Sequence, residues 1–213
     1  MKRRSLRRIC LLLLLLMLAG CQQKPAAPTE TKYSYQFFDT FDTIIQLRGY
    51  TPDKDTFTRY AQQTQARFEE LSRFYDRFYE YEGINNICTI NKNAGVAPVE
   101  VSDEILDLLE FSVRQYEKTD GQVNIAMGPV LSIWHDYMKT YSGADPQTAQ
   151  LPPMEELQAA AQHTDLSKLI IDREAGTVFL TEAGMSLDVG AVAKGYAAQV
   201  VADELYADGL TSF

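Results

Sequence analysis

Apolar residues recur every three or four positions in three long stretches of the chain, which is the spacing of one face of an α-helix. The first stretch begins at Thr51-Pro52-Asp53, where an N-cap residue, a proline and a first-turn acid are typical of a helix start, and runs to about Arg73. The second begins at Ser102 and runs to about Glu117, and the third follows Gly190. The predicted inward faces carry Ala61, Thr64, Phe68 and Leu71; then Ile105, Leu108, Leu109 and Val113; then Ala193, Tyr196, Ala197, Val200, Val201 and Leu205.

Short runs of β-branched, aromatic and aliphatic residues predict strands between and beside these helices. Residues 33–47 are predicted as strand material with a turn or bulge at Asp39 and Asp42. Residues 169–172, 177–180 and 185–188 are separated by turn residues, and they predict an antiparallel meander that leads directly into the third helix. Because helices and antiparallel strands occupy separate parts of the chain, we expect an α+β fold in which helices pack on an antiparallel sheet.

The remaining segments have weaker patterns. Asparagine and glycine make residues 85–97 typical of turns, although residues 87–90 within it form an apolar, strand-like run that would bury Cys88. Residues 122–129 predict extended chain that turns at Gly-Pro into a helix, with Trp134 as an anchor in the core.

The two histidines give no sign of a functional site. His135 follows Trp134, and His163 lies near the end of a short helix that starts at Pro153. Neither has an acid or a nucleophile at a telling spacing, so both are expected at the solvent edge. Their separation predicts no histidine metal site.

The first 21 residues have the organisation of a bacterial lipoprotein signal. Five basic residues precede an apolar run, residues 9–18, that is shorter than a membrane span, and Leu18-Ala19-Gly20-Cys21 resembles a lipobox. In this interpretation residues 1–20 are removed and the Cys21 thiol carries the lipid. The predicted organisation is therefore a signal peptide at 1–20, a flexible proline-containing tether at 21–32, and a domain at 33–213 anchored on the extracytoplasmic side of the cell membrane.

Charge narrows the range of partners. The 213-residue chain has a formal net charge of −9, and removal of residues 1–20 leaves 15 basic against 29 acidic residues, a net charge of −14. Such an acidic domain argues against nucleic acid as a partner, since phosphate backbones are bound by basic surfaces. A phosphate ligand would have to rely on a few local groups or on a divalent cation. Cys88 is the only cysteine that remains after Cys21, so no disulfide within the chain is expected.

Residues 186–205 combine a predicted strand end, a glycine turn and a helix whose first turn carries Lys194. The first N–H groups of a helix and its positive dipole end attract anions, and a lysine one turn inside would add a positive charge. This pattern indicates a phosphate site, but it matches neither G-x-x-x-x-G-K-[ST] nor G-x-G-x-x-G. A structural joint remains the alternative, with Lys194 solvated and Asp188 capping the helix.

An aromatic cluster separates the first helix from the asparagine-rich segment. It comprises Phe74, Tyr75, Phe78, Tyr79 and Tyr81. The cluster predicts either core packing with an amphipathic rim or a wall on which a planar ring stacks. The pattern alone leaves both interpretations open.

In this order the motifs resemble the ApbE family of FAD:protein FMN transferases, over about residues 33–213. The most specific match is residues 187–197, L-D-V-G-A-V-A-K-G-Y-A, which is similar to the family's D-[LV]-G-[GA]-[IV]-A-K-G-[YF]-A. Thr119-Asp120-Gly121, then Gly128-Pro129 and Trp134, match further family positions, as do Ile90-Asn91 and the P-V-E-V-S at residues 98–102. The resemblance implies an ApbE-like, T-fold-like domain that these 213 residues cover only in part.

The resemblance also implies a reaction. An exported enzyme binds FAD and Mg²⁺, a threonine hydroxyl of an acceptor flavoprotein attacks the pyrophosphate, FMN becomes linked to that threonine, and AMP leaves. Alternatives are an FAD pyrophosphatase, which would use water in place of threonine, and a non-catalytic flavin-binding lipoprotein.

Residues carry over from the family motifs one by one. Asp188 and Lys194 match FAD contacts, and the main-chain carbonyl of Ala191 matches a Mg²⁺ ligand. The family's segment after T-D-G implies FAD contacts at Gln122, Val123 and Asn124, although many members have aspartate at the last position. Phe38 stands where many members have the methionine of M-G-T. Tyr81 is the preferred aromatic against the flavin nucleotide, and Tyr79 is its rival.

The resemblance places the family's side-chain metal ligands, an aspartate and a threonine, after residue 213. The last five residues look like the start of a strand whose partner would lie downstream. We therefore expect the catalytic residues downstream of Phe213 and expect the 213-residue chain to be inactive alone.

Overall fold

The structure is a computed structural model that describes residues 30–143, 145 and 147–213. The predicted signal peptide, the lipidated Cys21 and most of the tether lie outside the described residues. In chain order the elements are β1 (Thr31–Thr40), β2 (Thr43–Thr51), α2 (Lys54–Tyr75), α3 (Ile87–Lys92), β3 (Val99–Glu100), α4 (Asp103–Lys118), η1 (Ile125–Met127), α5 (Gly128–Tyr141), α6 (Met154–Ala161), η2 (Leu166–Lys168), β4 (Leu169–Asp172), β5 (Thr177–Leu180) and α7 (Gly190–Ala207). The mixture of helices and antiparallel strands confirms the α+β prediction.

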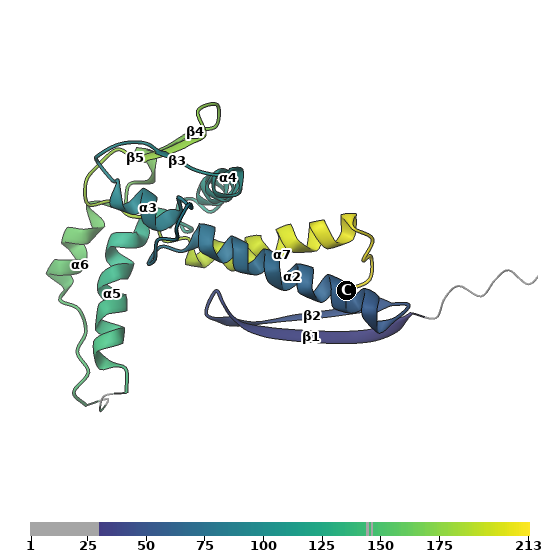
Figure 1. The fold of residues 1–213 in the computed structure, drawn as a ribbon. Helices are drawn as coiled ribbons and strands as arrows, with labels where there is room; N and C mark the ends of the chain where they lie inside the picture. Colours follow the sequence, from purple (N-terminus) through teal and green to yellow (C-terminus); the bar gives the residue numbers. More distant parts are fainter. Residues whose placement is uncertain (1–29, 144, 146) are drawn as a thin grey trace, which may run out of the picture.

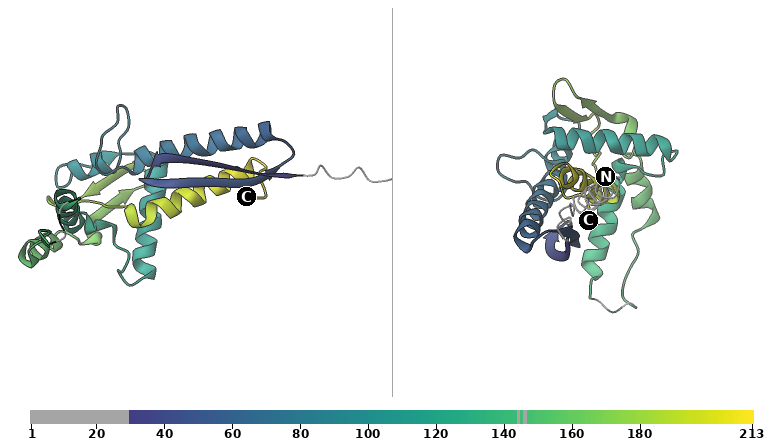
Figure 2. Two further views of the ribbon diagram at one scale, coloured as in Figure 1. Left: turned by 90° about the horizontal axis from the view of Figure 1, so that it is seen from below. Right: turned by 90° about the vertical axis from the view of Figure 1, so that its right-hand side faces the viewer.

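A long hairpin forms one side of the molecule (Figures 1 and 2). Strands β1 and β2 pair antiparallel, with a register shift between Phe37 and Thr40, as predicted for a bulge or turn in this segment. Phe41 and Asp42 make the turn with φ angles of 54° and 50°, the left-handed region that non-glycine residues enter mainly in tight turns. Helices α2 and α7 run alongside each other against this hairpin, so their inward stripes share one core.

Helix α2 confirms the predicted apolar stripe but begins two residues later than predicted. Ala61, Thr64, Phe68 and Leu71 are all buried. The N-cap is Asp53, whose carboxylate accepts the N–H of Thr56 at 2.8 Å, whereas Thr51 still belongs to β2. Both a hydroxyl and a carboxylate can accept a free N–H at a helix start, but only the carboxylate brings a negative charge to the positive end of the helix dipole.

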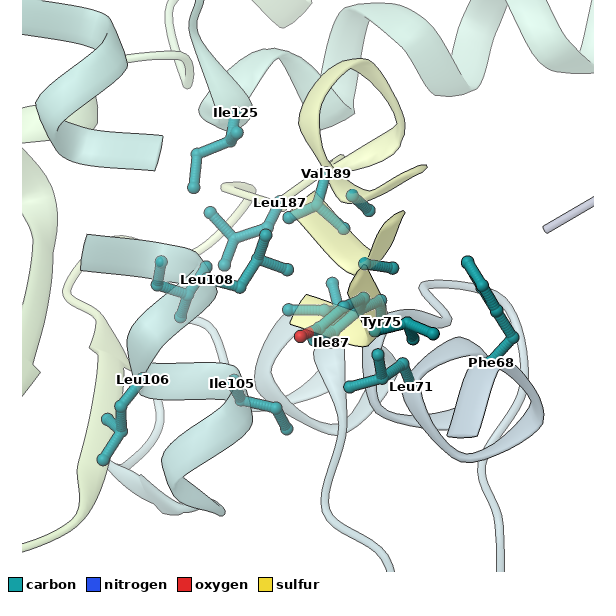
Figure 3. Packing of buried hydrophobic residues seen from close by; sticks show 14 of the residues in the cluster. Phe68, Leu71, Tyr75, Ile87, Ile105, Leu106, Leu108, Ile125, Leu187 and Val189 are labelled. Carbon is teal, nitrogen blue, oxygen red and sulfur yellow. The ribbon is translucent and has the colours of Figure 1, made fainter. Parts of the chain in front are cut away.

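The core continues from α2 into the other half of the molecule (Figure 3). Helix α4 buries the predicted Ile105, Leu108 and Leu109 on a face that meets Leu71 and Tyr75 of α2. Three residues join them from segments without regular strand structure, namely Ile125, Leu187 and Val189. The segment before α7, residues 185–189, belongs to no strand, and these buried side chains hold it in place.

The small sheet differs from the predicted meander. Strands β4 and β5 form the expected antiparallel pair, but the neighbour on the other side of β5 is β3, and residues 185–188 form no strand. The prediction of a third meander strand at residues 185–188 was therefore wrong. The alternation of buried Met185 and Leu187 with less buried neighbours is real, but this segment lies between α3 and η1 rather than on the sheet edge.

The segment predicted as irregular contains a short helix. Asn86 caps α3 by accepting the N–H of Thr89, and the Thr89 hydroxyl accepts the N–H of Asn86 in return. Cys88 therefore lies in a helix and not in a strand, but it is buried as expected, and burial raises the pKa of its thiol. Burial and a raised pKa both keep a thiol in its unreactive protonated form, as expected for a structural cysteine.

Three further predictions fall around α5 and α6. Trp134 does not anchor the core, because 42% of its surface is exposed on α5. His135 is exposed on the same helix, as expected, whereas His163 is half-buried and lies 2.7 Å from Glu182. The predicted extended run at residues 122–129 was wrong: Gln122 and Val123 lie in bends, only Asn124 has extended backbone angles, and residues 125–127 form η1.

The last residues of the chain form no strand, although the N–H of Tyr50 on β2 donates to the Ser212 carbonyl at 3.0 Å. Among the described helices, none combines the length and the apolar character that crossing a bilayer would require.

Candidate functional site

A cavity of about 340 Å³ opens at the N-terminal end of α7, and we call it the α7 cavity. Three parts of the chain form it: the turn of the β1–β2 hairpin, the end of α2 with the loop that follows, and the start of α7. It is lined by Phe41, Asp42, Ser72, Tyr75, Asp76, Arg77, Phe78, Tyr79, Tyr81, Asp188, Val189, Gly190, Ala193 and Lys194. The cavity thus joins the glycine–lysine segment to the aromatic cluster, two features that are more than a hundred residues apart in the sequence.

The start of α7 confirms the predicted joint of a glycine and a helix. The reason for a glycine at position 190 is not the sharp turn that the sequence suggested. Its φ angle is not positive, so no left-handed turn requires glycine there. Instead, a Cβ atom at Gly190 would lie 3.0 Å from Oδ1 of Asp188, and the Gly190 N–H donates to that same oxygen at 2.9 Å. A side chain there would require the Asp188 carboxylate, which folds back onto the first turn, to shift by a few tenths of an ångström, and glycine avoids this.

The first turn of α7 offers fewer free donors than an isolated helix would. The N–H groups of Val192 and Ala193 both donate to the carbonyl of Val189, at 2.9 and 2.8 Å, and Gly190 donates to Asp188. Lys194 is exposed and lines the cavity one turn in, as predicted. The attraction for an anion therefore rests on the helix dipole and on side-chain cations more than on free backbone groups.

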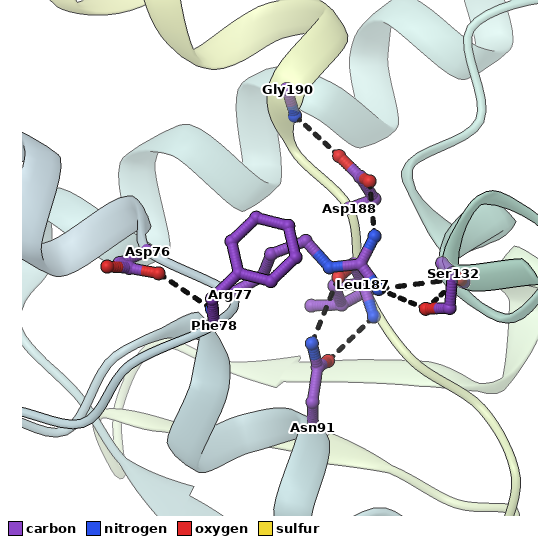
Figure 4. A network of polar contacts seen from close by, with 9 residues as sticks. Asp76, Arg77, Phe78, Asn91, Ser132, Leu187, Asp188 and Gly190 are labelled. Atoms are coloured by element: carbon purple, nitrogen blue, oxygen red, sulfur yellow. Dashed lines mark hydrogen bonds and ion pairs between the residues drawn. The ribbon is translucent and has the colours of Figure 1, made fainter. Parts of the chain in front are cut away.

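The main chain at Leu187 and Asp188 is held by contacts from two other elements, the first of which is drawn in Figure 4. The side chain of Asn91 bonds both main-chain groups of the preceding residue, with Oδ1 accepting the Leu187 N–H at 2.6 Å and Nδ2 donating to the Leu187 carbonyl at 3.0 Å. The Asp188 N–H donates to the carbonyl of Ile125 at 2.8 Å. An amide side chain on α3 and one carbonyl of η1 thus replace the neighbouring strand that the sequence pattern predicted.

Arg77 is the residue that sequence reasoning missed. It follows the end of α2, and its guanidinium forms an ion pair with the Asp188 carboxylate while also donating to the Ser132 hydroxyl and, at 3.4 Å, to the Gly128 carbonyl. The side chains of Arg77 and Asp188 are only 11% and 19% exposed. The one signal for it in the sequence is a basic residue inside an otherwise aromatic run, and the pairing needs a fold that brings position 77 to position 188.

Gly128 explains why glycine precedes proline at the start of α5. Its φ angle is not positive, but a Cβ atom there would lie 2.3 Å from the carbonyl oxygen of Ser186. The helix can therefore approach the segment before α7 only when position 128 has no side chain. This close contact places Ser132 beside Arg77.

The aromatic wall is built by Asp76. One of its carboxylate oxygens accepts the N–H groups of Phe78 and Tyr79, at 2.6 and 3.1 Å, and the other accepts the Tyr81 hydroxyl at 2.7 Å. Burial and this carboxylate together raise the pKa of Tyr81 to about 12, so its hydroxyl stays protonated at physiological pH. The wall therefore presents three aromatic rings, Phe78, Tyr79 and Tyr81, to the cavity.

The predicted site residues separate into two groups. Asp188, Lys194 and Tyr81, with its rival Tyr79, lie together around the α7 cavity. Phe38, Gln122, Val123, Asn124 and Ala191 do not line it. Phe38 is 55% exposed on β1, and the hairpin contributes Phe41 and Asp42 of its turn instead.

Residues 122–124 take part in the architecture next to the cavity. The amide oxygen of Asn124 accepts the N–H of Ala126 at 2.8 Å, and its amide nitrogen donates to the carbonyl of Thr164 at 2.9 Å. The Val123 N–H donates to the Thr119 hydroxyl at 3.0 Å. These bonds shape η1, whose Ile125 carbonyl supports Asp188.

The described residues do not by themselves form a magnesium site. They contain no group of three or more His, Cys, Asp or Glu side chains that would hold a metal ion. Asp188 is already bonded to Arg77 and Gly190, and Asp76 to three donors of its own loop. The carbonyl of Ala191 belongs to the first turn of α7 and supplies at most one of the six or so oxygen ligands that the ion prefers.

A second hollow of about 520 Å³, which we call the α5 groove, lies on the other side of Asp188. Its walls are mainly apolar and aromatic: Leu131, Trp134, His135, Tyr137, Met138, Tyr141, Ala149, Gln150, Leu151 and Asp188. The rings of His135 and Phe78 lie 5.0 Å apart, which joins the groove to the aromatic wall. Asp188 is the residue that lines both hollows.

Comparison with known sequences finds one family and a consistent set of relatives. The sequence profile of the ApbE family matches residues 41–213. A protein named FAD:protein FMN transferase from Klebsiella pneumoniae (strain 342) is 30% identical over 138 residues, which are 65% of this chain and 41% of the relative. A protein of the same name from Escherichia coli (strain K12) is 25% identical over 213 residues, 98% of this chain and 58% of the relative. The chain thus spans about half the length of the relatives it matches.

Solved structures agree on the fold. The flavinyl transferase ApbE from Pseudomonas stutzeri, in its apo form, is similar with a TM-score of 0.69 at 18% identity over 87% of this chain and 58% of that one. The ApbE protein from Thermotoga maritima gives a TM-score of 0.66 at 21% identity, over 80% of this chain and 51% of that one.

Proposed function

The chain belongs to the ApbE family, and from that premise we propose that its domain binds FAD and serves the transfer of FMN from FAD to a protein. The observation that carries the proposal is the α7 cavity, where a helix N-terminus, Lys194 and the Arg77–Asp188 pair face a wall of aromatic rings. A dinucleotide has a doubly charged pyrophosphate between two planar ring systems. The cavity offers positive groups for the first and ring-stacking surface for one of the second.

Each group has a distinct task in this proposal. Lys194 and the dipole of α7 attract the pyrophosphate, and the aromatic wall holds one ring system so that the phosphates stay at the helix end. Tyr81 contributes its ring face, because its hydroxyl is already bonded to Asp76. The family motifs add Phe38, Gln122, Val123 and Asn124 as FAD contacts, reached by parts of the dinucleotide that extend beyond the α7 cavity.

We propose that the acceptor is a flavoprotein and that its reacting group is a threonine hydroxyl. The hydroxyl oxygen forms a bond to the phosphorus that carries riboflavin, the bridging P–O bond of the pyrophosphate breaks, the hydroxyl proton is released, and AMP leaves. A reaction of this kind depends on positioning and on charge neutralisation, which are the tasks assigned to the aromatic wall and to Lys194 with the α7 dipole.

Magnesium is part of the proposal, although the described residues alone do not hold it. Mg²⁺ would neutralise charge on the phosphates. We propose that the Ala191 carbonyl is one ligand and that the others come from the phosphates and from residues outside these 213.

The proposed location is the extracytoplasmic face of the cell membrane, with the domain held by lipid on Cys21. The support is the sequence of the first 21 residues. A tether that ends at β1 would let the domain meet a membrane-bound or exported acceptor.

One assay tests the reaction. The 213-residue chain and the full translation product of its gene are each incubated with FAD, Mg²⁺ and a threonine-bearing acceptor flavoprotein, and flavin fluorescence of the acceptor is followed in a denaturing gel. We expect labelled acceptor with the full product and none with the 213-residue chain. Free FMN and AMP without labelling would identify a pyrophosphatase, and intact bound FAD would identify a binding protein. Labelling by the 213-residue chain would contradict the expected downstream catalytic residues.

A further inference from the structure

Asp188 presents an electrostatic problem at the proposed anion site. Its carboxylate lies at the positive end of α7, bonded to the Gly190 N–H, so it occupies the place where a phosphate would be attracted. A free carboxylate there would repel a pyrophosphate, and the strongly acidic domain offers little positive charge elsewhere.

We propose that Arg77 is a positioning residue that neutralises Asp188 and thereby makes the α7 cavity able to accept an anionic nucleotide in preference to a neutral flavin. The inference rests on the proposed function for the identity of the nucleotide. The geometry that supports it, an arginine and an aspartate paired between the two hollows, is independent of that identity.

The exposure of the pair explains why it matters. With side chains only 11% and 19% exposed, Arg77 and Asp188 are screened by water far less than a surface pair. A charge left alone in such a place acts strongly on neighbouring ions. Lys194, in contrast, is exposed, so it cannot neutralise Asp188 with the same strength.

The other contacts of Arg77 fix where its charge lies. The guanidinium donates to the Ser132 hydroxyl and to the Gly128 carbonyl of α5, and its carbon lies 5.2 Å from the centre of the Phe78 ring. One side chain therefore ties together the loop with the aromatic wall, the start of α5 and the segment before α7. Arginine suits this task because its planar fork holds several donors in a fixed geometry, whereas the ammonium of lysine is a compact charge on a flexible stem.

A double-mutant cycle separates neutralisation from simple structural support. The variants are Arg77→Met, Asp188→Asn and both together, made in the full chain, with inorganic pyrophosphate as the probe and calorimetry as the measurement. Pyrophosphate has no ring to stack, so its affinity reports the electrostatics of the α7 end. Arg48→Met, an exposed arginine on β2, is the matched control because it removes the same charge from the chain outside the α7 cavity.

We expect Arg77→Met to weaken pyrophosphate binding by roughly tenfold, because it leaves a partly buried carboxylate unpaired beside the anion. The double variant should regain most of that loss, since it removes the repelling charge as well. Asp188→Asn alone should bind at least as tightly as the wild type, and Arg48→Met should bind like it. Arg77→Lys should fall between wild type and Arg77→Met.

Two results would overturn the inference. One is wild-type affinity in Arg77→Met. The other is a loss in Arg77→Met that Asp188→Asn does not restore, in protein whose circular dichroism shows a folded state, because a purely structural role predicts no rescue.

Parallel titrations of the wild type and Arg77→Met with FAD and with riboflavin keep the two proposals apart. Arg77-dependent pyrophosphate binding without FAD binding would support the role of Arg77 and contradict the proposed function. FAD binding that is equally tight in the wild type and in Arg77→Met would support the proposed function and contradict the role of Arg77. If both proposals hold, Arg77→Met weakens FAD binding and leaves the binding of uncharged riboflavin unchanged.

Discussion

At the scale of single residues, Asn91 shows how a side chain can stand in for a strand. Its amide bonds both the N–H and the carbonyl of Leu187, a residue that is completely buried. Buried main-chain groups must be bonded, and among the residues that the structure describes no neighbouring strand bonds these. The position of Asp188, and with it the proposed anion site, therefore depends on an amide on a different helix.

Replacing Asn91 by alanine should lower the free energy of unfolding by about 2–3 kcal/mol, because it leaves the two buried main-chain groups of Leu187 without partners. Asn85→Ala is the matched control, since the Asn85 amide makes one bond at the surface, to the Glu100 carbonyl, and should cost about 1 kcal/mol or less. Urea denaturation followed by circular dichroism measures both. Equal effects for the two variants would show that Asn91 does not hold the segment before α7.

Tyr81 gives a prediction about pH. Burial, followed by its bond to the Asp76 carboxylate, raises its pKa from an ordinary value near 10 to about 12. The folded state then holds the phenolic proton more tightly than the unfolded state, so this contribution to stability is complete below about pH 10 and is lost as the pH rises through about 12.

The tyrosinate absorbance of the wild type minus that of Tyr81→Phe should therefore titrate above pH 10. In an Asp76→Asn background the same difference should titrate lower than in the wild type, though still above the ordinary value, because burial remains. A difference curve centred at the ordinary tyrosine pKa in both backgrounds would contradict the described wall.

At the scale of elements, two glycines in helices differ in whether packing requires them. Gly128 at the start of α5 lets the helix approach the Ser186 carbonyl, where a Cβ atom would lie 2.3 Å away. Gly195 within α7 has no atom outside its own helix within 4 Å of an added Cβ atom. The first glycine is required by packing, and the second is not required by any contact of the described residues.

Gly128→Ala should destabilise the protein by about 2 kcal/mol, because α5 must move away from the segment before α7. Gly195→Ala should instead stabilise it by about 0.5–1 kcal/mol, since alanine loses less conformational freedom in a helix than glycine. Thermal denaturation of the two variants compares them directly. A stabilising Gly128→Ala would refute the close contact between α5 and Ser186.

Sequence reasoning was strongest for elements with a complete internal pattern. The stripes of α2, α4 and α7 and the β1–β2 hairpin follow from periodicity, which local contacts within each element enforce. It failed for residues 185–188, where alternating burial was read as a strand, and for α3, where asparagine was read as a turn although Asn86 caps a helix. For residues 185–188 the deciding contacts come from α3 and η1, whereas for α3 the deciding contact is the local capping box of Asn86 and Thr89.

At the scale of the whole molecule, the proposed lipid anchor is the feature that links the domain to its location. If Cys21 is lipidated, Cys21→Ser should abolish incorporation of labelled fatty acid and move the protein out of the membrane fraction, since no other lipidation site is proposed. Cys10→Ser is the matched control, because Cys10 would be removed with the signal peptide. Unchanged fatty-acid labelling of Cys21→Ser would contradict the anchor.

The site could be predicted in part because its motif is local. Asp188 and Lys194 lie six positions apart, and the sequence places both at the start of one helix. Tyr81 could be predicted as a site residue because it belongs to the aromatic cluster. Arg77 could not be predicted, because nothing around position 77 indicates that its guanidinium would meet a carboxylate at position 188.

The sequence by itself determined the helices with apolar stripes, the hairpin, the α+β class and the helix end with its lysine, because each depends on residues that are neighbours along the chain. Only the tertiary structure decided that Asp188 faces Arg77, that Asn91 replaces a strand and that Gly128 is a glycine for reasons of close approach. These features depend on pairs of positions that come together only when α2, α3, α5 and α7 pack, and the burial that gives such pairs their strength exists only in the folded chain.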